Sequence, residues 1–119
     1  MDNLKQLNYL YDEMLENVEK VASLLDVKDF VKILDVISQR EQLLSNIRAI
    51  QLSWQKPLPQ ELKFKADCIR EIEQMNIQRL EELRGDYAVD LEKTRQKETL
   101  LKKYSGVIKN TGEILDIKE

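Results

Sequence analysis

Residues 61–104 read ELKFKADCIREIEQMNIQRLEELRGDYAVDLEKTRQKETLLKKY, and this stretch decides the expected fold. It contains no proline and a single glycine, Gly85, and its apolar residues recur every three or four positions, as on one face of an α-helix. A continuous helix of this length would measure about 65 Å. Its apolar stripe needs a cover, so the sequence predicts a bundle of helices.

Two amphipathic stretches precede it, at residues 4–25 and 27–54, and they are expected to form the covering helices. The chain between them forms either a hairpin or a bent helix; we favour a hairpin in which Asp26 caps the second helix through the amide of Asp29. Gln55-Lys56-Pro57-Leu58-Pro59 ends the second helix because prolines cannot continue it. This short link predicts that the second and third helices pack as antiparallel neighbours.

The expected helix lengths leave part of the third helix uncovered. The first two helices would measure about 33 and 42 Å, so the C-terminal third of the third helix should overhang them. Leu100, Leu101 and Tyr104 would then be partly exposed. Ser105-Gly106 should stop the helix, and residues 107–119 should form a short helical tail. The prediction is one domain over residues 1–119, an all-α antiparallel three-helix bundle with a long third helix.

The composition restricts the class of protein. The chain has 119 residues, 42% hydrophobic and 34% charged, with 3 glycines and 2 prolines, which favours long helices. A net charge of −3 argues against a nucleic-acid partner, although residues 93–103 hold five basic residues and one acidic residue. No apolar run or signal sequence suggests membrane insertion or secretion. One cysteine, Cys68, fits a reducing cytosol, so a cytoplasmic location is expected.

The residue inventory argues against an enzyme. The chain has no histidine and one cysteine, so it offers no nucleophile dyad and no zinc ligand set. We predict no catalytic residue, metal or cofactor, and a binding surface instead. Trp54 is expected to fill the core rather than to bind a partner. Arg40 and Glu41 interrupt the apolar stripe of the second helix and are expected at its edge, with the Arg40 head in water.

Two stretches resemble a known family. Arg40-Glu41-Gln42-Leu43-Leu44 follows a short first helix, and the long helix closes with an Arg-Gln-Lys-x-x-x-Leu-x-x-Tyr pattern at residues 95–104, followed by Ser105-Gly106. In length, order and these motifs the chain resembles the FliT-type flagellar export chaperones. FlgN-type chaperones share a similar helical plan and are a related alternative.

The resemblance implies a cytosolic chaperone that binds the C-terminal helical region of the filament-cap protein FliD. It would prevent premature assembly of FliD and deliver it to the type III export gate FlhA, with contacts to export ATPase components. Tyr104 matches the tyrosine that helps such chaperones dock on the gate, and residues 107–119 match a tail that folds over the client groove in some members. The candidate docking residues are Arg95, Lys97, Leu101 and Tyr104. The candidate client-groove residues are Arg40, Leu44, Ile47, Ile69, Ile72, Ile77 and Leu80.

Two other functions remain open from the sequence. A structural module could use the overhanging helix to form a homodimer. A FlgN-like chaperone would take hook–filament junction proteins as its clients.

Overall fold

The computed structural model describes residues 3–53, 58–84 and 91–116, which form four helices and no strand. These are α1 (Asn3–Asp26), α2 (Phe30–Ser53), α3 (Gln60–Arg84) and α4 (Leu91–Asp116). The prediction of an all-α chain is confirmed. The prediction of a single helix over residues 61–104 is wrong, because this range contains most of α3 and the first part of α4, which are two separate helices.

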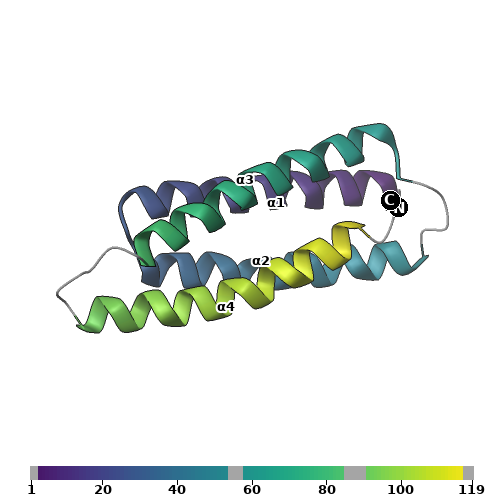
Figure 1. The fold of residues 1–119 in the computed structure, drawn as a ribbon. Coiled ribbons are helices and arrows are strands. Elements are labelled where there is room, and N and C mark those ends of the chain that lie inside the picture. Colours follow the sequence, from purple (N-terminus) through teal and green to yellow (C-terminus); the bar gives the residue numbers. More distant parts are fainter. Residues whose placement is uncertain (1–2, 54–57, 85–90, 117–119) are drawn as a thin grey trace.

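The helices run side by side in alternating directions and form an elongated bundle of 52 × 21 × 19 Å (Figure 1). Each helix contacts two others: α1 packs against α2 and α3, and α4 packs against α2 and α3. The backbones of α2 and α3 lie diagonally across the bundle and are not neighbours over their described residues, so the predicted pairing of the second and third helices is wrong. Leu58, which precedes α3, and Leu62, in its first turn, join the apolar cluster that includes Leu7 and Tyr11 of α1.

Helix α4 folds back along α3 and does not extend beyond the bundle. The Tyr104 hydroxyl donates to Glu73 Oε2 at 2.7 Å; in one continuous helix these residues would lie about 46 Å apart. The physical reason is coverage: α1 to α4 have 24, 24, 25 and 26 residues, so four helices of similar length cover one another's apolar faces. The predicted overhang is therefore wrong.

Ser105 and Gly106 lie inside α4, which continues to Asp116, so the predicted helix stop and the separate tail from residue 107 are also wrong. The Ser105 hydroxyl donates to the Leu101 carbonyl 2.8 Å away, within the helix. Residues 117–119 of the expected tail, and Trp54, lie outside the described residues.

A tight turn joins α1 to α2, which confirms the hairpin. The amide of Asp29 donates to the Leu24 carbonyl at 3.1 Å, and that of Lys28 donates to the Leu25 carbonyl at 3.2 Å. This pattern is a Schellman motif, and Lys28 occupies its left-handed position with φ 56°. The Asp29 carboxylate accepts the Lys32 amide at 3.2 Å, so Asp29 caps α2 and the prediction of Asp26 as the cap is wrong. Asp26 forms an ion pair with Arg79 of α3.

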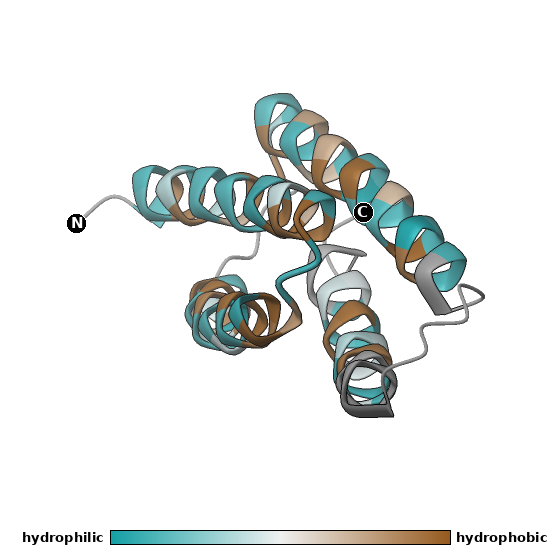
Figure 2. Cartoon of the chain, turned by 90° about the vertical axis from the view of Figure 1, so that its left-hand side faces the viewer, coloured by the Kyte–Doolittle hydropathy of each residue, from teal (hydrophilic) through white to brown (hydrophobic). Residues whose placement is uncertain are grey.

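The buried apolar residues form two clusters along the bundle. Seen from one end of the bundle in Figure 2, the helices carry hydrophobic and hydrophilic residues on different sides, as amphipathic packing requires. One cluster contains Leu7, Tyr11, Met14, Val18, Leu44, Ile47, Leu58, Leu62, Ala66 and Ile69. The other contains Val21, Leu25, Phe30, Ile33, Val36, Ile37, Leu80, Leu100, Tyr104 and Val107.

Candidate functional site: a buried polar layer and three grooves

A layer of buried polar side chains joins all four helices in the middle of the bundle. Its members are Asn17 of α1, Arg40 of α2, Glu73 and Asn76 of α3, and Tyr104 of α4. Arg40 Nη1 pairs with Glu73 Oε1, and Arg40 Nε donates to Asn17 Oδ1 at 2.8 Å. Tyr104 donates to the other Glu73 oxygen. Asn17 and Asn76 donate to backbone carbonyls of Val36 and Val18, at 2.9 and 3.0 Å.

The charges of this layer are shielded from water. Arg40 is 0% exposed, so the prediction that its head lies in water is wrong. The Glu73 carboxylate on α3 neutralises its charge, and the sequence around Arg40 gives no sign of this partner because it lies 33 residues later. Its guanidinium carbon also lies 5.3 Å from the centre of the Tyr104 ring, a cation–π distance. Burial, followed by the charge of Glu73, raises the pKa of the Tyr104 hydroxyl well above its usual value near 10. Tyr104 therefore acts as a neutral hydrogen-bond donor.

Most of the candidate client-groove residues lie in the core in this conformation. Leu44, Ile47, Ile69 and Leu80 are buried, as is Arg40. Ile72 and Ile77 are half-buried and pack against the two apolar clusters. A face made jointly by the second and third helices does not occur among the described residues, since α2 and α3 lie diagonally across the bundle.

The candidate docking residues lie on α4. Tyr104 is 1% exposed and Leu101 is half-buried against the second cluster. The side chains of Arg95 and Lys97 lie outside the described part of the chain. Tyr104, which the sequence places on an exposed overhang, is thus an inward-facing member of the polar layer.

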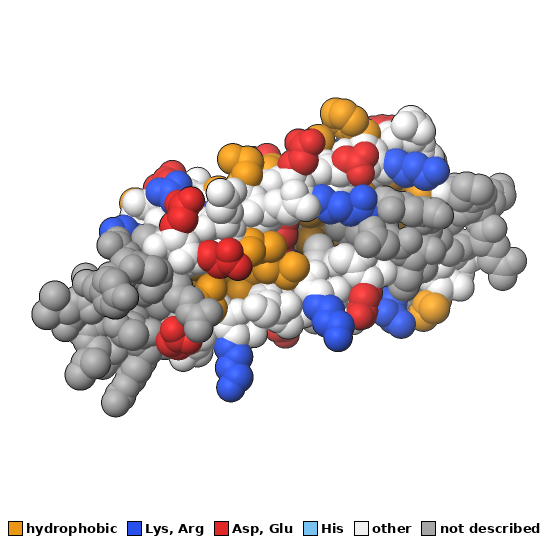
Figure 3. All heavy atoms as spheres, in the orientation of Figure 1, with side chains coloured by type: hydrophobic (Ala, Val, Ile, Leu, Met, Phe, Trp, Pro, Cys, Tyr) orange, Lys and Arg blue, Asp and Glu red, His pale blue; other side chains and the backbone are white. Residues whose placement is uncertain are grey.

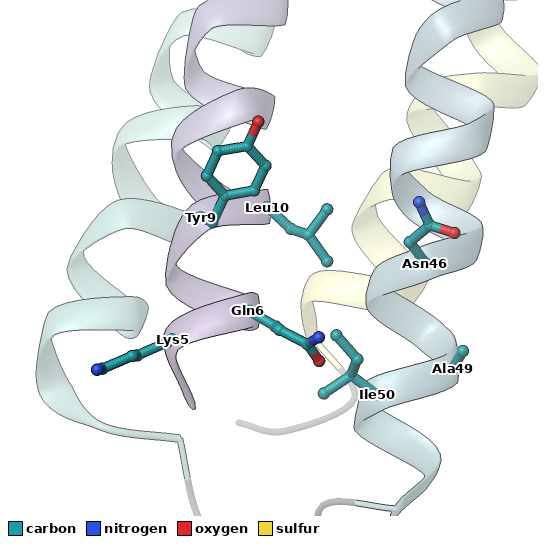
Figure 4. A pocket seen from close by; sticks show the side chains of 7 residues that line it. All are labelled: Lys5, Gln6, Tyr9, Leu10, Asn46, Ala49 and Ile50. Carbon is teal, nitrogen blue, oxygen red and sulfur yellow. The ribbon is translucent and has the colours of Figure 1, made fainter. Parts of the chain in front are cut away.

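A surface groove lies between α1 and α2, near the start of α1, and has a volume of about 560 Å³ (Figure 4). This α1/α2 groove has apolar walls formed by Tyr9, Leu10, Ala49 and Ile50. Lys5, Gln6 and Asn46 form its polar edge. Tyr9 is 64% exposed, and the Glu13 carboxylate, by its hydrogen bond and its charge, raises the Tyr9 pKa. Leu10 and Ile50 rest on the first apolar cluster, so the floor of the groove is fixed by the core.

Sequence reasoning missed this groove. The apolar run Leu7, Leu10 and Tyr11 predicts one buried face of α1, and Tyr9 lies just outside that face. An aromatic residue beside a helix's apolar stripe, on the solvent side, was the available signal. The opposite wall comes from Ala49 and Ile50, about 40 residues later, which a local pattern cannot bring to α1.

A smaller groove of about 200 Å³ lies between α3 and α4. It contains two of the candidate client residues, Ile69 and Ile77, with Ile108 and Gly112 of α4 opposite and Glu73 beneath. Figure 3 shows apolar side chains exposed in the middle of this face of the molecule. We call it the α3/α4 groove.

A third groove, the α2/α4 groove, has a volume of about 490 Å³ and a basic lining. Arg48, Lys102 and Lys103 contribute three positive charges, against the single carboxylate of Glu41. Ser45, Gly106, Val107 and Asn110 complete its lining. Lys103 donates to the Ser38 hydroxyl at 2.9 Å and so ties α4 to α2 beside the groove.

The described residues offer no group of three His, Cys, Asp or Glu side chains that could hold a metal ion. Cys68 is a free, half-exposed thiol. None of the four described helices has both the length and the apolarity needed to cross a membrane. Comparison with family models, curated proteins and solved structures gives no match.

Proposed function

We propose that this chain is a FliT-type flagellar export chaperone of the cytoplasm. It binds the C-terminal helical region of the filament-cap protein FliD, prevents premature assembly and delivers FliD to the export gate FlhA. The two stretches that carry the resemblance, 40–44 and 95–104, are distant in sequence, yet Arg40 and Tyr104 contact each other in the polar layer. This contact supports the proposal because it gives both motifs one structural role.

The α1/α2 groove is the observation that carries the proposal. An amphipathic helix binds by placing apolar residues at i, i+3, i+4 and i+7 into a groove between two helices. The exposed apolar walls and polar edge of the α1/α2 groove match such a ligand, and its core-supported floor needs no rearrangement on binding. We assign the client helix to this groove. The α3/α4 groove, with Ile69 and Ile77, is the alternative client position.

Groove-filling substitutions test the assignment. Ala49→Arg places a long side chain in the α1/α2 groove and keeps a good helix former at an exposed position. It should lower the affinity for the C-terminal helical region of FliD at least tenfold in calorimetric titration. Ser23→Arg, at an exposed site of α1 outside the groove, is the matched control and should bind normally. Gly112→Leu fills the α3/α4 groove. If Gly112→Leu lowers the affinity for FliD and Ala49→Arg does not, the client helix belongs in the α3/α4 groove.

Two further measurements separate the alternatives. Light scattering should show a monomer that gains mass with FliD, whereas a stable homodimer indifferent to FliD would contradict the chaperone proposal. The dimer alternative relied on an overhang, and that segment packs against α2 and α3. Binding of hook–filament junction proteins in preference to FliD would favour the FlgN-like alternative.

We also propose that α4 docks on FlhA. Of the candidate docking side chains that are described, Leu101 is partly accessible and Tyr104 is not. Leu101→Ala should therefore weaken binding to FlhA in a pull-down while leaving FliD binding intact. Equal loss of both activities would contradict a separate docking role.

A further inference from the structure

The four helices divide into an acidic pair and a basic pair. Helices α1 and α3, which pack together, carry 11 acidic and 7 basic residues, whereas α2 and α4 carry 6 acidic and 9 basic residues. One of the basic residues is the buried Arg40 and one of the acidic residues is the buried Glu73. Without this pair, α1 and α3 carry 10 acidic and 7 basic residues, and α2 and α4 carry 6 acidic and 8 basic residues. Basic side chains project along the lower edge of Figure 3, where α4 runs, beside a few acidic ones.

The positive charge of the basic pair converges on the α2/α4 groove. Arg48 of α2 and Lys102 of α4 line it from opposite walls, and neither makes an ion pair or side-chain hydrogen bond within the described structure. Like charges across a groove repel each other unless a ligand of opposite charge lies between them. The Glu41 carboxylate also lines the groove but pairs with neither, so three positive charges against one negative charge leave a net charge of +2 that an external anionic ligand can balance.

The shape and lining of the groove define the kind of ligand. Gly106 leaves a hollow in the α4 wall: a Cβ at this position would meet no heavy atom within 4 Å. A helical glycine costs about 1 kcal/mol relative to alanine, and no close contact within the bundle explains this one. Ser45 and Asn110 add hydrogen-bonding groups, beside the almost fully buried Val107. The ligand thus has side chains of its own and is not a bare inorganic ion.

We propose that the α2/α4 groove binds an acidic amphipathic segment of a partner protein, with carboxylates between Arg48 and Lys102 and a side chain in the Gly106 hollow. A nucleic acid fits less well, because the net charge of the whole chain is −3 and only three basic residues line the groove. The site shares no residue with the α1/α2 groove, so it does not depend on the proposed client position.

Fluorescence anisotropy with a defined probe tests the site on the full chain. The probe is a labelled synthetic helical peptide of about 18 residues with glutamates and leucines along one face; its twin has glutamine for glutamate. The glutamate peptide should bind at low salt, and its affinity should fall when salt rises from about 50 to about 200 mM. The glutamine twin should bind at least tenfold more weakly.

Variants then locate the binding. Arg48→Glu and Lys102→Glu should each weaken the glutamate peptide about fivefold to tenfold, since each replaces an attraction by a repulsion. Lys109→Glu, an exposed position of α4 outside the groove, is the charge-matched control and should change affinity less than twofold. Gly106→Leu should abolish binding by filling the hollow, with an unchanged or raised melting temperature that shows an intact fold.

Several results would overturn the proposal. These are absence of peptide binding at low salt, equal binding of the glutamine twin, or a loss in Lys109→Glu as large as in Lys102→Glu. Tighter binding of a short DNA or RNA oligonucleotide than of the peptide would also overturn it, because the site would then read phosphates. Loss of FliD binding in Ala49→Arg with retained peptide binding would show that the two sites are separate.

Discussion

Glu73→Gln tests the buried polar layer most directly. Glutamine keeps the shape of glutamate, and its side-chain oxygen can still accept the hydrogen bond from the Tyr104 hydroxyl. The substitution therefore removes the charge and little else. It leaves the Arg40 guanidinium, which is 0% exposed, without its counterion. Breaking a buried ion pair from one side typically costs about 3–5 kcal/mol. A domain of this size has a total stability of about 5–15 kcal/mol, so the loss should be large.

The assay is urea unfolding followed by circular dichroism, compared at a constant slope against denaturant. Glu71→Gln, an exposed neighbour on α3, is the matched control and should change the unfolding free energy by less than about 0.5 kcal/mol. The double variant Arg40→Met, Glu73→Leu should lose less unfolding free energy than Glu73→Gln alone, since no unpaired charge remains in the core. A cost below about 1 kcal/mol for Glu73→Gln would refute the assignment of a desolvated pair.

Three further predictions concern other features of the bundle. Lys28→Gly should raise the unfolding free energy by about 1 kcal/mol, because glycine adopts the positive φ without steric cost. Thermal melting measures this change, and a lower melting temperature than that of the unmodified chain would contradict the turn geometry. Gly112→Ala should raise the unfolding free energy by about 0.5–1 kcal/mol, since a Cβ there meets no atom within 4 Å. A lower melting temperature in the same assay would show that a neighbouring atom is in close contact with this position. Because the folded-state pKa of Tyr104 is raised, its hydroxyl contributes stability that is complete below about pH 10 and is lost as pH rises above 10. Tyr104→Phe should therefore flatten the fall of unfolding free energy between about pH 10 and 12, and an unchanged pH profile would argue against burial of the hydroxyl.

The parts of the fold set by local pattern were predictable from the sequence. Residues 4–25 and 27–54 show helical periodicity, and α1 and α2 lie within about three residues of those bounds. The break between α3 and α4 was not predictable in the same way, since the helical spacing continues through Leu83, Tyr87 and Leu91. A single glycine, Gly85, does not predict a reversal, because a reversal also needs partners for the returning helix, and those come from α2 and α3.

The candidate site was predicted less well, for a related reason. An interruption of the apolar stripe at Arg40 was visible, yet its burial depends on Glu73, 33 residues later, and on Tyr104 beyond that. Tertiary pairing decides whether a charged residue inside a stripe lies at the edge or in the core. The same holds for the α1/α2 groove, whose walls are contributed by residues far apart in the chain.

The polar layer also constrains how the helices can slide past one another. Each of the four helices places at least one of its members at the same level, between two apolar clusters. A shift of one helix by a single turn, about 5.4 Å, would place Arg40 or Glu73 against hydrocarbon and separate the pair. Apolar layers alone tolerate such shifts, since one leucine can replace another. The Arg40–Glu73–Tyr104 contacts therefore fix the register of the bundle, and with it the alignment of the groove walls on α1, α2, α3 and α4.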